Sequence, residues 1–144
     1  MIINTNTCPK ETSEVTANRQ SRLRQWPCKI PFALECAPYF DGAELLIAAD
    51  CTAYAHGNFH TEFMKNAITL IGCAGLNSEA IKKKLAAIIA QNEIKGIKVL
   101  RMEVPCCERL EGLVKDAITE SGKNVSMEVL ILSTDGKILE GKRK

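Results

Sequence analysis

Short apolar runs alternate with amphipathic stretches along most of the chain. The run LLIAA at residues 45–49 is continuous, which is typical of a strand buried on both faces. A turn-forming sequence, TDGK at residues 134–137, separates the last two apolar runs. We expect strands at residues 45–49, 67–72, 97–104, 127–132 and 138–139.

The amphipathic stretches predict helices. The clearest covers residues 78–92, where Asn77 or Ser78 can cap the amino end and Glu79 suits the positive end of the helix dipole. A second helix is expected at residues 107–121, followed by Gly122 as the residue that ends it. A short one is expected at residues 58–66. The apolar positions that share one face are Ile81, Leu85, Ile88 and Ile89 in the first helix, and Leu110, Leu113, Val114, Ala117 and Ile118 in the second.

Strands that alternate with helices favour an α/β fold, because parallel strands need crossover connections and these are usually helices. We therefore predict a single domain with a mostly parallel sheet of four to five strands, covered by helices on both faces as in a Rossmann-like three-layer sandwich. A first strand at residues 28–34 is also expected, although Pro31 confines it to an edge or a strand start.

The two ends of the chain are polar. Residues 1–24 contain too few aliphatic side chains to offset the entropy of ordering, so we expect a flexible leader. The α/β domain is expected to cover residues 25–140, with Trp26 packed against its edge. Residues 141–144 (GKRK) are expected to form a frayed basic tail.

Composition narrows the class of protein. The chain has 144 residues, of which 46% are hydrophobic and 25% charged, and a formal net charge of +2. Such values are ordinary for one soluble globular domain, and the charge is too small to indicate a nucleic-acid partner. The longest apolar runs are interrupted by polar residues, and the first residues lack the pattern of a signal peptide, so no membrane association is expected. Seven cysteines without such a signal indicate a cytoplasmic protein with metal-binding or redox thiols.

Four of these cysteines directly follow predicted strands: Cys51, Cys73, Cys106 and Cys107. The carboxyl ends of parallel strands form one edge of a sheet, where ligands bind, so the four thiols are expected to lie on one rim. Cys106 and Cys107 also stand at the start of a predicted helix, whose dipole favours the thiolate. A single cysteine in such a place is more often a small buried side chain, and four together favour a site.

Thiolate ligands select zinc or an iron–sulfur cluster. The close C-x2-C pairs of structural zinc sites are missing, and so is the bacterial ferredoxin run of cysteines. Because a cluster accepts ligands from distant loops, an iron–sulfur cluster is favoured over zinc.

Residues 22–139 resemble the C-terminal domain of 4Fe-4S ferredoxin-type iron–sulfur proteins of anaerobes. The matching stretches are LRQWP (23–27), APYFDGAELLIAADCTAYAHGNFH (37–60), ITLIGC (68–73), RMEVPCC (101–107) and LSTDG (132–136). The resemblance implies a 4Fe-4S cluster bound by Cys51, Cys73, Cys106 and Cys107, in an accessory domain for anaerobic electron transfer with a redox protein as partner. In that family two ferredoxin motifs precede the domain, and this chain has the polar leader with Cys8 in their place.

The spacing C-x32-CC of Cys73 and the adjacent pair is also similar to the first half of the cysteine-rich modules of heterodisulfide-reductase-type proteins. Those modules bind iron–sulfur clusters through vicinal cysteines, and their downstream C-x-x-C is missing here.

Other candidate residues have simpler explanations. His56 and His60 have the i, i+4 spacing of a helical metal site, but Gly57 lies between them and a surface position is expected instead. The remaining cysteines, Cys8, Cys28 and Cys36, are expected to lie outside the rim.

Three functions stay open. The leading one is an iron–sulfur binding accessory domain that is not an enzyme by itself. The second is a thiol-redox protein in which Cys106 and Cys107, or either with Cys73, form a reversible disulfide. The third is a cofactor-free interaction domain. The sequence does not determine the oligomeric state.

Overall fold

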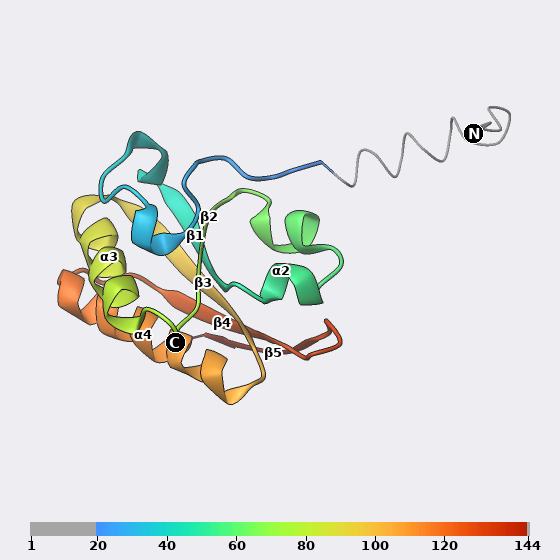
Figure 1. Cartoon of the computed structure of the whole chain (residues 1–144). Helices are drawn as coiled ribbons and strands as arrows, with labels where there is room; N and C mark the ends of the chain where they lie inside the picture. Colours follow the sequence, from blue (N-terminus) through green and yellow to red (C-terminus); the bar gives the residue numbers. More distant parts are fainter. Residues whose placement is uncertain (1–19, 144) are drawn as a thin grey trace, which may run out of the picture.

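A five-stranded sheet forms the centre of the computed structural model, which describes residues 20–143 (Figure 1). The strand order is β2-β1-β3-β4-β5. The first four strands are parallel, and β5 pairs with β4 in the antiparallel direction. The α/β class and the mostly parallel sheet are thus confirmed. The strands are β1 (Ala43–Ala49), β2 (Ala67–Gly72), β3 (Ile94–Met102), β4 (Met127–Leu132) and β5 (Ile138–Arg143).

Two long helices cover one face of the sheet, α3 (Ser78–Gln91) and α4 (Pro105–Ser121) (Figure 1). Their apolar stripes meet alternate side chains of β1 to β4 in the larger hydrophobic cluster. Gly122 ends α4 with a φ of 75°, a left-handed conformation that glycine adopts without strain. Both helices agree with the predictions from apolar periodicity, because each has a stripe wide enough to require burial.

The opposite face is covered by the short connection between β1 and β2. This connection contains the four-residue helix α2 (Thr52–Ala55) and a single π-helical turn, η3 (His60–Met64). Phe59 and Phe63 are buried against Leu46 and Leu100 in a second cluster. A helix was predicted at residues 58–66, and the structure forms only one turn there, with Phe59 and Phe63 buried. The chain therefore leaves β1 toward one face and leaves β3 toward the other.

The prediction of a strand at residues 28–34 is wrong. Only Lys29 makes a bridge, to Ile71 of the edge strand β2, and a 3-10 helix, η1 (Ile30–Phe32), follows it. Pro31 lies within that helix, where its missing N–H costs no ladder bond. A second 3-10 helix, η2 (Pro38–Phe40), leads into β1.

The domain extends beyond the expected boundaries at both ends. Leu23 packs against the second cluster, and the Arg22 N–H donates to His60 Nδ1 at 3.1 Å. At the other end, the expected tail continues β5 as far as Arg143, which pairs with Glu128. Trp26 is 75% exposed, so the prediction that it packs against the domain edge is wrong. Residues 1–19 and residue 144 lie outside the described part, and with them most of the expected leader and Cys8. No helix within the described residues is long and apolar enough to cross a membrane.

Candidate functional site

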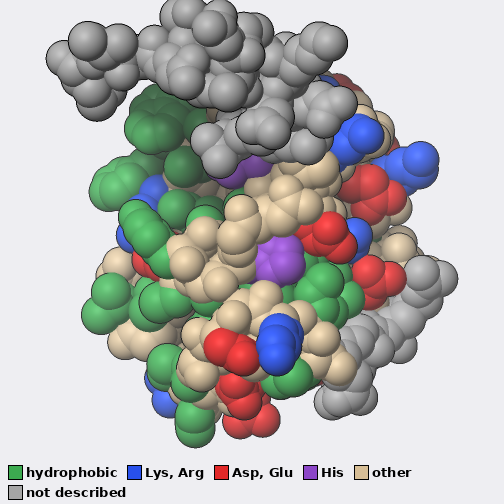
Figure 2. Space-filling view, turned by 90° about the vertical axis from the view of Figure 1, so that its right-hand side faces the viewer, with side chains coloured by type: hydrophobic (Ala, Val, Ile, Leu, Met, Phe, Trp, Pro, Cys, Tyr) green, Lys and Arg blue, Asp and Glu red, His purple; other side chains and the backbone are tan. Residues whose placement is uncertain are grey.

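The carboxyl ends of three neighbouring strands bring the predicted cysteines to one rim. In the order β2-β1-β3, each strand is followed by cysteine: Cys73 after β2, Cys51 after β1, and Cys106 and Cys107 after β3. The Asp50 N–H donates to the Gly72 carbonyl at 3.1 Å, so Cys51 and Cys73 each follow a residue of one hydrogen-bonded pair. Figure 2 views the side of the molecule that carries α2 and the β4–β5 turn, where hydrophobic side chains, a class that includes cysteine, reach the surface beside charged ones.

The loops after β1 and β3 diverge at this rim. The first leads to α2 on one face of the sheet, and the second leads to α4 on the other. Adjacent parallel strands whose connections turn to opposite faces leave a crevice at their carboxyl ends, which is the usual ligand site of open α/β sheets. Cys51 stands on one side of this position, and Cys106 and Cys107 stand on the other.

The start of α4 holds the adjacent pair. Val104 is the N-cap residue, Pro105 occupies the first turn, and the Cys107 N–H donates to the Val104 carbonyl at 3.0 Å. Cys106 is exposed and Cys107 is half-buried, in contact with both hydrophobic clusters. The two thiols therefore have different environments although they are adjacent in sequence.

Burial raises the pKa of the Cys107 thiol above its ordinary value of 9.0. A hydrogen bond from the Met102 backbone opposes this shift, and the neighbouring thiols of Cys106 and Cys51 add to it. Cys51 and Cys106 therefore lie close enough to Cys107 to influence its ionisation. Desolvation at this half-buried position therefore acts against the thiolate that the amino end of the helix favours.

Alkylation should follow this difference. With iodoacetamide at increasing pH, we expect Cys106 to react first and Cys107 to react only at higher pH, as followed by mass spectrometry of peptides. The same shift makes the native state lose stability as the pH rises above 9.0, because the unfolded thiol ionises before the folded one. Equal rates for Cys106 and Cys107 across the pH range would contradict this assignment.

Cys73 lies beside a cation that the sequence did not reveal. Lys29 Nζ lies 3.0 Å from Asp50 Oδ2, and a backbone hydrogen bond from Ile71 to Cys28 attaches this segment to the end of β2. The hydrogen bond to Asp50 and the charge of that carboxylate raise the pKa of Lys29, with smaller contributions from Cys73 and Cys28. Cys28, expected to lie away from the rim, is therefore near it.

The rim cysteines come from three separate segments. Cys51 and Cys73 follow the hydrogen-bonded residues Asp50 and Gly72, and Cys106 and Cys107 lie in the first turn of α4. Within residues 20–143, no three histidine, cysteine, aspartate or glutamate side chains are arranged to hold a metal ion. None of the described cysteines is in a disulfide.

Both histidines have structural contacts. The ring of His56 packs edge-on against Phe63, with ring centres 4.9 Å apart, and its Nδ1 lies 2.8 Å from the Gly136 carbonyl oxygen. His60 Nδ1 accepts the hydrogen bond from the Arg22 N–H. His56 thereby joins the end of α2 to the turn between β4 and β5, and this turn stabilises the connection that begins at Cys51.

Sequence comparison agrees with this architecture. Residues 37–144 match the family described as Rossmann-like domain. The chain belongs to this family. The Rossmann-like domain is also 32% identical, over 117 residues, to an uncharacterized protein of Archaeoglobus fulgidus. That alignment covers 81% of this chain and 82% of the relative. No solved structure matches this Rossmann-like domain.

Proposed function

We propose that the rim is a thiolate site that binds an iron–sulfur cluster, or another thiolate-bound metal, in an accessory domain for anaerobic electron transfer. The observation that supports this proposal is the cysteine after each of three adjacent parallel strands, at the edge of the sheet where the connections turn to opposite faces. The ligands would be Cys51, Cys73, Cys106 and Cys107. The resemblance to the domain that follows ferredoxin motifs in anaerobes, which motivated this proposal, makes a 4Fe-4S cluster the first choice.

Charge at the rim also suits a thiolate ligand set. Several thiolates close together repel one another, and nearby positive charge lowers this cost. The amino end of α4 supplies free N–H groups next to Cys106 and Cys107, whereas the ammonium group of Lys29 is already paired with Asp50. For all four thiols to act as ligands, the loop after β2 has to bring Cys73 toward Cys107.

Anaerobic reconstitution tests this proposal. Full-length protein incubated with Fe²⁺, sulfide and a thiol reductant should acquire visible absorption, and reduction should produce an EPR signal. The number of thiols that react with a maleimide should fall when the cluster forms. A protein that stays colourless, with every thiol still reactive, would rule out the cluster.

A second candidate, thiol-redox chemistry, is favoured by the environment of Cys107. Its half-buried thiol lies near two exposed thiols, Cys51 and Cys106. A disulfide within this group would join an accessible cysteine to a protected one. Oxidised glutathione would accept the two electrons: one thiolate attacks its disulfide, a second resolves the mixed disulfide, and two molecules of reduced glutathione are released. Mass spectrometry should then show loss of two hydrogens from the protein and a linkage within this group. Persistent glutathione adducts without an internal disulfide would contradict it.

A further inference from the structure

The two edges of the sheet differ in how their backbone groups are covered. At the β2 edge, the Ile71 N–H donates to the Cys28 carbonyl at 2.9 Å, and Gln25 Nε2 donates to the Thr69 carbonyl at 2.5 Å. At the opposite edge, β5 pairs only with β4 within the described part of the chain. The outer side of β5 therefore presents N–H and C=O groups that can pair with another strand.

The open edge strand begins with apolar side chains that reach the solvent. Ile138 is 43% exposed and Leu139 is 54% exposed, so a further strand beside them would remove apolar surface from water. The β4–β5 ladder is irregular between Ile131 and Leu132, and the rest of β5 pairs in regular register. Gly141 lies within this regular part, and glycine inside a strand often marks a place where another backbone approaches closely.

The sequence of β5 is complementary in charge to itself when two copies run antiparallel. Glu140 and Lys142 stand on either side of Gly141, and their register partners on β4 are the uncharged Ile131 and Val129. A lysine on an edge strand usually opposes pairing. In a pairing that is centred on Gly141, however, Glu140 lies opposite Lys142 of the second copy, and two-fold symmetry repeats this pair. Centring on Glu140 or on Lys142 places like charges opposite each other, so charge favours the register centred on Gly141.

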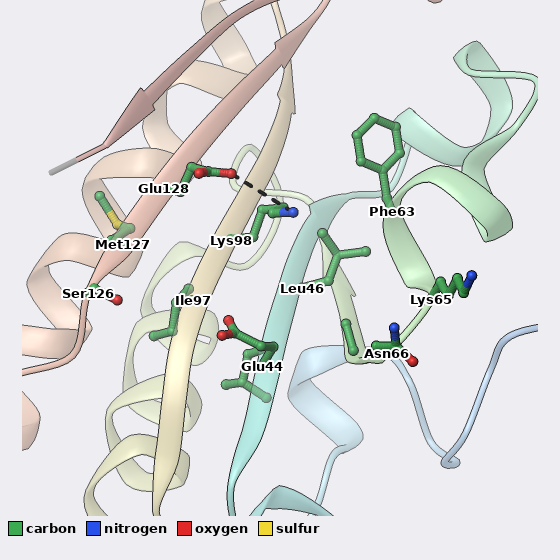
Figure 3. A pocket seen from close by; sticks show the side chains of 12 residues that line it. Glu44, Leu46, Phe63, Lys65, Asn66, Ile97, Lys98, Ser126, Met127 and Glu128 are labelled. Atoms are coloured by element: carbon green, nitrogen blue, oxygen red, sulfur yellow. Dashed lines mark ion pairs between the residues drawn. The ribbon is translucent and has the colours of Figure 1, made fainter.

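The sheet already contains one cross-strand pair of this kind. Lys98 of β3 and Glu128 of β4 are register partners, and their side chains form an ion pair of 3.9 Å (Figure 3). The pair lines a pocket of about 400 Å³, in which the other charged lining residues, Glu44 and Lys65, also have opposite signs. Opposite charges on neighbouring strands are thus accommodated in this sheet, as the pairing through β5 requires.

We propose that two copies of this chain associate through β5, in antiparallel pairing centred on Gly141, so that one sheet runs through both copies. The backbone ladder holds the two strands together, and the two pairs of Glu140 with Lys142 determine the register. The second copy covers the exposed Leu139 of the first. This association does not depend on what the cysteine rim binds.

Sedimentation velocity of full-length protein over a range of concentrations tests this association. A thiol reductant excludes dimers that are linked through exposed cysteines. The fraction of dimer should rise with concentration in the wild type. Lys142→Glu should weaken the association about tenfold or more, because it places like charges opposite each other at both symmetry-related positions. Glu140→Lys should have the same effect, and the double variant Glu140→Lys/Lys142→Glu should restore the dimer.

The matched control is Lys83→Glu, which makes the same change of charge at an exposed position of α3. This variant should dimerise like the wild type. A wild-type protein that stays monomeric at every concentration would overturn the proposal. A dimer that neither single reversal weakens would overturn it as well, and so would a double variant that is folded by circular dichroism and still monomeric.

Discussion

Replacing Gly136 with alanine should lower the free energy of unfolding by about 3 kcal/mol, because two costs add at this position. Gly136 has a φ of 88°, which strains any residue that carries a β-carbon, and that carbon would lie 2.1 Å from the Ala55 carbonyl oxygen. The β4–β5 turn must then move away from α2 and lose its contact with His56. The melting temperature should fall by roughly 10 °C in a calorimetric scan.

Two other glycines separate these costs. Gly42 has a φ of 73° and no atom near its would-be β-carbon, so Gly42→Ala measures conformational strain alone. Gly57 has neither the strain nor a close neighbour, and Gly57→Ala should leave the melting temperature almost unchanged. Because α2 begins directly after Cys51, Gly136→Ala should also accelerate alkylation of Cys51. If the Gly136→Ala protein were no less stable than Gly42→Ala, the close contact between the β4–β5 turn and Ala55 of α2 would not contribute to stability.

The second large effect is expected at Asn92, a side chain only 2% exposed that follows α3. Its Nδ2 donates to the carbonyls of Glu35 at 2.8 Å and Ile88 at 2.7 Å, and its Oδ1 accepts from the Ala37 N–H at 3.3 Å. Asn92→Ala removes all three bonds and leaves backbone groups without partners. We expect a loss of roughly 3 kcal/mol, measured by urea unfolding.

Asn77 provides the matched control for this substitution. It stands at the opposite end of the same helix, is exposed, and makes no side-chain capping bond. Asn77→Ala should therefore change the free energy of unfolding by less than about 0.5 kcal/mol. Equal stability of the two variants would mean that the hydrogen bonds of the Asn92 side chain do not hold residues 35–37 against α3.

The parallel strands and the two long helices could be predicted because their apolar periodicity reflects burial directly. Ser78–Gln91 and Pro105–Ser121 both have stripes that need a covering surface, and the residues after them break the helix. The structures of the segment around Pro31 and of the connection after Cys51 were harder to predict from the sequence. Their short helices are held by contacts distant in sequence, such as His56 with Gly136, which local pattern does not encode.

The position of the candidate site could be predicted from the sequence, but the surroundings of its side chains could not. Strand ends indicated where the rim cysteines would lie, because parallel strands end at a common edge. The role of Lys29 was not predictable, since it depends on a bridge to β2 and an ion pair with Asp50. The burial that raises the pKa of Cys107 was not predictable either, because the position of a helix start can be read from sequence, whereas the depth of burial at its first turn cannot.

The most direct test of the rim as a cluster site is the iron and sulfide content of cysteine variants after anaerobic reconstitution. Cys51→Ser and Cys106→Ser alter exposed side chains, so the fold should be unaffected while cluster content falls severalfold. Cys36→Ser is the control, because Cys36 is exposed and lies between Glu35 and Ala37, which are bound to Asn92 at the other end of the domain. The proposal predicts wild-type content in Cys36→Ser alone, and full content in Cys51→Ser and Cys106→Ser would contradict it.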